Sequence, residues 1–160
     1  MSLQEPDRTI TPGGVRMLSH GEHLVIFGLR AMATGQMDCP VVRRAFEALL
    51  AGNADRTLGD LLVFVRLLAL AATRRLRVHA PGCCALSGDE VLMLSAIGAA
   101  QTEPAADGAH GLRAALGRLC DAPPSTGLAL ATVNLAETLT RGGVDLGTMR
   151  AGLPGSATRH

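Results

Sequence analysis

Two adjacent cysteines, Cys83 and Cys84, follow His79 at a distance of four residues in the stretch RRLRVHAPGCCALSGDE. Thiolates and imidazoles are ligands that zinc accepts in four-coordinate sites, and the Pro-Gly turn lets the histidine ring fold back toward the thiols. A third cysteine, Cys39, stands directly before a proline at a predicted helix start. Helix N-termini stabilise the thiolate, which favours metal binding and nucleophilicity. One interpretation is therefore a zinc or iron site made by Cys39, His79, Cys83 and Cys84.

Two other interpretations of the cysteine pair stay open. Structural zinc sites usually take Cys-x2–4-Cys ligand pairs, and adjacent cysteines project in different directions. The pair could instead be a reactive thiol, with His79 as the base of a Cys–His dyad in an enzyme or a thiol-based regulator. It could also be small apolar residues that fill a corner below a helix, since free cysteine is among the most buried residue types.

Arg74, Arg75 and Arg77 form the one basic cluster of the sequence and predict an anion-binding site. The alternative is that they complement the negative end of a preceding helix dipole. In the same way, the acids Asp89 and Glu90 are expected to complement the positive end of the next helix. Nucleic acid is a disfavoured partner, because the chain has no Trp or Tyr, only three Phe and a net charge of +1.

A second histidine pair occurs in Ser19-His20-Gly21-Glu22-His23. The two imidazoles share one helix face with a carboxylate between them, so they could hold a metal. However, Glu22 is the expected partner of Ser19 in a capping box, and the spacing differs from the His-Glu-x-x-His of zinc hydrolases. We interpret this segment as a solvated first turn.

The chemistry-bearing residues are positioned by helices. Helix starts are predicted at Ser19, Cys39, Thr57, Ser87 and Ser125, with one more helix from about residue 107, and no convincing β pattern occurs. The sequence predicts an all-α fold, a compact bundle of five or six helices around a central apolar helix at about 58–73. The predicted domain spans 18–147, flanked by flexible tails at 1–17 and 148–160.

Composition points to a function without catalysis. Of the 160 residues 48% are hydrophobic and only 18% are charged, which suggests apolar surface shared between subunits. The longest apolar run, LLVFVRLLALAA, is too short to cross a bilayer, and no phosphate-binding glycine motif is present. We predict a small cytoplasmic, non-enzymatic protein that acts by protein–protein or self-association, with a membrane role excluded. The alternative is a metal-binding or thiol-based regulatory protein.

Overall fold

The computed structural model describes residues 18–102 and 110–146, and this part of the chain is entirely helical, without a strand. The predicted all-α bundle is confirmed. The predicted tails at 1–17 and 148–160 lie outside the described residues. The elements are α1 (His20–Ala33), α2 (Pro40–Leu50), the 3-10 turn η2 (Ala51–Asn53), α3 (Ala54–Ala71), α4 (Gly88–Thr102), α5 (His110–Cys120) and α6 (Thr126–Arg141).

The predicted caps explain where three helices begin. At α1, the Ser19 hydroxyl accepts from the Glu22 amide, and the Glu22 carboxylate accepts from the Ser19 amide at 2.8 Å. Ser87 and Glu90 make the same reciprocal pair at the start of α4. Ser125 accepts from the third amide of α6. Side-chain oxygens thus satisfy amides that lack a partner inside the helix.

The third helix begins earlier than predicted. It runs over Ala54–Ala71 rather than 58–73, because the 3-10 turn Ala51–Asn53 leads directly into it. The expected N-cap, Thr57, is a buried residue inside the helix, and its hydroxyl donates to the Asn53 carbonyl. The three arginines of the basic cluster therefore lie beyond the helix end, in an extended connection.

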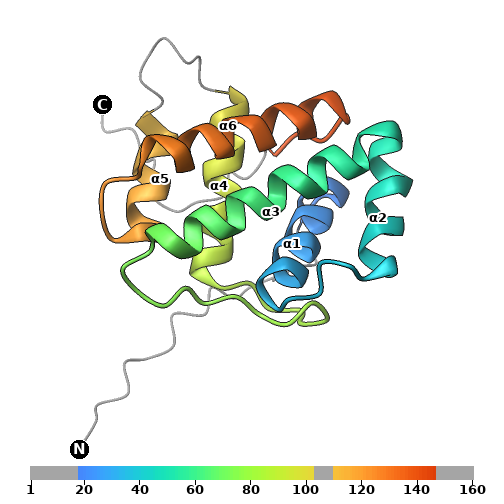
Figure 1. Cartoon of the computed structure of the whole chain (residues 1–160), viewed down its shortest axis with the longest axis horizontal. Coiled ribbons are helices and arrows are strands. Elements are labelled where there is room, and N and C mark those ends of the chain that lie inside the picture. The colour runs from blue at the N-terminus through green and yellow to red at the C-terminus, as the bar shows by residue number, and fades with distance from the viewer. Residues whose placement is uncertain (1–17, 103–109, 147–160) are drawn as a thin grey trace, which may run out of the picture.

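Figure 1 shows the arrangement of the bundle: α3 and α6 lie side by side on the viewer's side, and α4 passes behind them. The two front helices are antiparallel, since Thr138 of α6 bonds Asp60 near the start of α3 at 3.1 Å. At the other end, the Thr73 amide donates to the Cys120 carbonyl at 3.0 Å. The helix α3 packs against α1, α2, α5 and α6, as expected of a central helix. One of its faces is nevertheless open to solvent.

A close helix crossing fixes α1 against its neighbours. Gly28 is buried, and a Cβ atom there would lie 2.6 Å from Phe46 Cζ and 2.7 Å from Leu61 Cδ2. Both neighbouring side chains are themselves fully buried. The absence of a side chain at Gly28 therefore lets α2 and α3 approach α1 and holds this helix in place beside the connection between α3 and α4.

No helix in residues 18–102 or 110–146 combines the length and apolar character needed to cross a membrane.

Candidate functional site

The connection between α3 and α4, residues 72–87, is held against the bundle by a buried ion pair. Arg30 of α1 binds Glu90 of α4 in a two-point contact, Nε to Oε1 at 2.7 Å and Nη2 to Oε2 at 3.1 Å. Their side chains are 1% and 0% exposed. Two further guanidinium N–H groups donate to the carbonyls of Cys83 and Ala85. Arg30 thus fixes the backbone on both sides of the second cysteine.

Glu90 also holds the 72–87 connection, through contacts of its own. Its carboxylate accepts from the amides of Ser87, at 2.8 Å, and His79, at 3.1 Å, and its Oε2 lies 3.2 Å from His79 Nδ1. Burial raises the pKa of Glu90, but the hydrogen bonds from Arg30, Ser87 and His79 outweigh it and hold the pKa below its ordinary value. The residue is both the capping partner of α4 and the anchor of the connection.

Asp89 grips the first part of the same connection. Its carboxylate lies 3.0 Å from Arg74 Nη1 and accepts from the Arg77 amide at 2.7 Å. Burial raises the pKa of Asp89, but the hydrogen bonds from Arg74 and Arg77 together lower it by more. The pKa of Asp89 therefore lies below its ordinary value. Arg74 also donates to the Arg118 carbonyl at 3.3 Å. The expectation that Asp89 and Glu90 merely complement a helix dipole was therefore incomplete.

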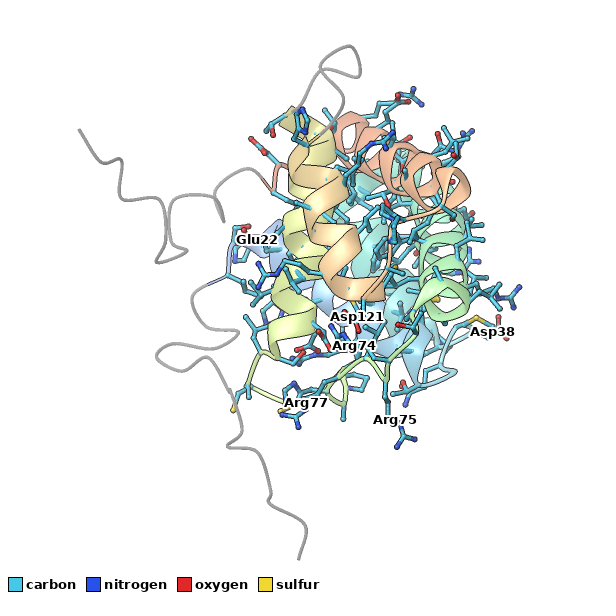
Figure 2. The ribbon with its side chains drawn as sticks, turned by 90° about the vertical axis from the view of Figure 1, so that its left-hand side faces the viewer. Glu22, Asp38, Arg74, Arg75, Arg77 and Asp121 are labelled. Carbon is cyan, nitrogen blue, oxygen red and sulfur yellow. The ribbon has the colours of Figure 1, made fainter. Side chains whose placement is uncertain are left out.

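These contacts change the interpretation of the predicted anion site. The Arg74 guanidinium is partly exposed and engaged with Asp89, whereas Figure 2 shows Arg75 directed outward into solvent. Arg77 is exposed, and its carbonyl accepts from the Ser87 hydroxyl. Arg74 already has a carboxylate partner, and anion binding by Arg74, Arg75 and Arg77 stays a prediction.

The predicted metal ligands are not gathered in one place. The His79 ring faces the Glu90 carboxylate, and Cys39 sits at the N-cap of α2, half-buried against the core and without a capping hydrogen bond. Cys83 is half-buried and Cys84 is exposed. Among the residues that the structure describes, no group of three His, Cys, Asp or Glu side chains could hold a metal ion.

The two cysteines instead line a cavity of about 450 Å³ beside α1. The lining also includes His20 and His23, the histidine pair that the sequence indicated was a solvated first turn. Their i, i+3 spacing places both rings on one helix face, but no sequence signal indicated that the cysteine loop lies across from them. The cavity is lined by Leu18, His20, His23, Ile26, Phe27, Arg30, Pro81, Gly82, Cys83 and Cys84.

A second distinctive surface lies elsewhere, on the solvent side of α3 and α6. Exposed residues recur at spacings of three and four along both helices, which places each set on one side of its helix. The two helices themselves lie side by side (Figure 1). We call this surface the α3–α6 face, defined by Val63, Arg66, Leu70, Leu130, Asn134 and Glu137.

Comparison with known proteins identifies no relative: no protein-family model, curated protein or solved structure matches the chain.

Proposed function

We propose that this chain is a non-enzymatic module that self-associates through the α3–α6 face. The observation that carries the proposal is the exposure of large apolar side chains there: Leu70 is 83% exposed, Leu130 59% and Val63 49%. Large apolar side chains left in solvent on two neighbouring helices of a well-packed domain are a feature of protein interaction surfaces. The low charged content of the whole sequence, 18%, supports the same proposal.

The antiparallel packing places these side chains on neighbouring helices. Leu70 lies near the end of α3, and Leu130 lies near the beginning of α6, so both belong to the same end of the helix pair. Val63 lies two helical turns back along α3, and on the same side of it. The exposed apolar side chains of α3 therefore span two turns of the helix rather than a single leucine.

The charges on the α3–α6 face favour a second copy of the chain as the binding partner. The exposed Arg66 guanidinium makes no hydrogen bond or ion pair to any other described residue, whereas Glu137 carries the opposite charge on the neighbouring helix. In a two-fold contact the same patch meets itself, so Arg66 of each copy can face Glu137 of the other. The present partner of Glu137 is Arg141 at 3.1 Å, an exposed i, i+4 pair of low energy that can be exchanged.

The assignment to the cytoplasm belongs to the same proposal. All four cysteines are free thiols. Cytosolic reductants keep thiols reduced, so free cysteines are consistent with a protein of the cytoplasm.

Light scattering coupled to size-exclusion chromatography tests the proposal. We expect the full chain to be a dimer, Leu70→Glu to be a monomer, and Val41→Glu to remain a dimer. Val41, on α2, is 62% exposed and outside the α3–α6 face, so it is a matched control for adding a carboxylate to an exposed apolar site. A wild-type monomer at about 100 µM, where a contact with a dissociation constant of about 1 µM is populated, overturns the proposal.

Reciprocal charge reversal tests the partner. Arg66→Glu and Glu137→Arg should each weaken the dimer, and the double variant should restore it. If the dimer of the double variant is less stable than the dimers of both single variants, Arg66 does not face Glu137 across the contact.

A further inference from the structure

The connection between α3 and α4 contains a segment, residues 73–79, whose backbone hydrogen bonds alternate along the chain. The amides of Arg77 and His79 donate to carboxylates of α4 at 2.7 and 3.1 Å, and the Arg77 carbonyl accepts from the Ser87 hydroxyl. The Thr73 amide donates to the last carbonyl of α5 at 3.0 Å. All of these groups belong to every second residue, so one edge of the segment is bonded to the helices.

The other edge of the segment is open. Within the part of the chain that the structure describes, the backbone N–H and C=O groups of Leu76 and Val78 make no hydrogen bond. Successive peptide groups of an extended chain point to opposite edges, so these groups lie on the side away from α4. Buried peptide groups without a partner are rare, which indicates that water solvates this edge. The segment therefore has the free edge of a strand without a neighbour.

The side chains of residues 73–79 follow the same two-residue period. Arg75 and Arg77 are exposed, whereas Leu76 and Val78 are half-buried and pack against the hydrophobic core. This alternation is typical of a strand with one covered face. The covered face and the bonds to α4 fix the segment, so its open edge is already ordered before a partner binds, which lowers the entropic cost of binding.

We propose that the open edge of residues 73–79 binds an extended acidic peptide of a partner protein by strand addition. In this mode of recognition the backbone of the incoming peptide pairs with an unpaired strand edge, and the side chains provide specificity. Leu76 and Val78 each offer one N–H and one C=O group to such a peptide. The surface is separate from the α3–α6 face.

Charge favours an acidic peptide over a second copy of the chain. The Arg75 guanidinium is directed into solvent (Figure 2) and makes no ion pair to another described residue. The neighbouring acids, Asp89 and Glu90, lie at the bonded edge and have arginine partners of their own. Pairing with the same segment of a second copy would bring Arg75 and Arg77 of both chains together, and like charges on paired strands are destabilising. A peptide with carboxylates at alternate positions attracts Arg75 instead.

Amide hydrogen exchange of the full chain, resolved by NMR, tests the proposal with a short peptide of alternating valine and glutamate as the probe. In the free chain we expect fast exchange at Leu76 and Val78 and slow exchange at Arg77 and His79. The peptide should slow exchange at Leu76 and Val78, and a peptide with lysine in place of glutamate should not. Slow exchange at Leu76 and Val78 in the free chain, no effect of the glutamate peptide, or equal effects of the two peptides overturns the proposal.

Fluorescence anisotropy of the labelled glutamate peptide provides a second readout on variants. Leu76→Pro removes one open N–H and should weaken binding by at least about 10-fold. Leu76→Ala keeps this N–H and is the matched control for the lost side chain, so it should bind as the wild type does. Arg75→Glu should weaken binding about 5- to 10-fold without a change in the backbone. Circular dichroism checks that each variant is folded, and unchanged affinity in Leu76→Pro or in Arg75→Glu overturns the proposal.

The same variants separate this proposal from self-association through the α3–α6 face. Leu70→Glu should bind the glutamate peptide with the affinity of the wild type, because Leu70 lies outside residues 73–79. A dimer that persists in Leu70→Glu and is lost in Leu76→Pro would show that a second copy occupies the open edge, and it would overturn the proposal of an acidic peptide.

Discussion

Buried charge holds the 72–87 connection against α1 and α4, whereas the face formed by α3 and α6 leaves leucine and valine in solvent. On the first side, Arg30 and Glu90 are almost completely buried, and the guanidinium donates to the Glu90 carboxylate and to two backbone carbonyls. On the second side, Leu70 is 83% exposed. Charge inside and apolar surface outside are both costly for an isolated domain. The comparison suggests that the first arrangement fixes the shape of a loop and the second is covered in an assembly.

The largest expected effect is on the buried side. Glu90→Gln removes the charge that compensates Arg30 and should lower the free energy of unfolding by about 3–5 kcal/mol, because an unpaired buried charge remains. Urea denaturation followed by circular dichroism measures this change. Glu47→Gln is the control, since Glu47 is 53% exposed and lies 4.0 Å from Arg43, and should change stability by no more than about 0.5 kcal/mol. Equal effects of the two variants would show that burial of the pair does not matter.

Asp89→Asn should have the next largest effect. It weakens the bonds from the Arg74 guanidinium and the Arg77 amide, and charged hydrogen bonds of this kind contribute about 1.5–3 kcal/mol each. Hydrogen exchange should show faster exchange of the Arg77 amide while the core of α4 stays protected. Uniform acceleration across α4 would instead mean that Asp89 supports the helix rather than the connection.

Acid should weaken the contacts by which Asp89 and Glu90 hold the 72–87 connection. The folded-state pKa values of Asp89 and Glu90 lie below their ordinary values of 3.8 and 4.5. A carboxylate with a lowered pKa stabilises the fold above its unfolded-state pKa, and this contribution is lost as the pH falls through the folded-state pKa. We therefore expect the free energy of unfolding to decrease below about pH 4.5, with a shallower decrease in Asp89→Asn. If the free energy of unfolding depends on pH identically in the wild type and in Asp89→Asn, the assigned role of Asp89 is contradicted.

The smallest effect is expected on the exposed side of α3. Gly59→Ala should stabilise the monomer by about 0.5–1 kcal/mol, because alanine is the better helix former and an added Cβ there meets no atom within 4 Å. Gly28→Ala should have the opposite sign, a loss of about 1–3 kcal/mol, since its Cβ would collide with Phe46 and Leu61. Thermal unfolding distinguishes the two, and destabilisation by Gly59→Ala would show that this face is not open.

The parts of the fold that depend on local spacing could be predicted from the sequence. A serine followed three residues later by a glutamate predicted the starts of α1 and α4, because both partners of the capping box lie within one helical turn. The same reasoning failed at Thr57, where a following Asp60 imitated a cap inside a helix that had already begun. A capping-box pattern identifies a possible first turn of a helix, but it does not distinguish that turn from one inside a helix that has already begun.

The site could not be predicted, because it is made by contacts between distant residues. Arg30 and Glu90 are 60 positions apart, and nothing in either local sequence names the other as a partner. An arginine within the apolar stretch HLVIFGLRAM was the one available signal that a buried acid must exist. The position of His20 and His23 across from the cysteine pair likewise depends on how the connection is folded back over α1.

The most direct test of self-association is the molar mass of the wild-type chain by multi-angle light scattering over a range of concentrations. The chain mass is 16.5 kDa, so a dimer has twice this value, 33 kDa. We predict a mass that rises to the dimer value with concentration in the wild type and stays at the monomer value in Leu70→Glu. A wild-type mass of 16.5 kDa at every concentration would contradict the central claim and leave the exposed leucines of α3 and α6 without a second copy to cover them.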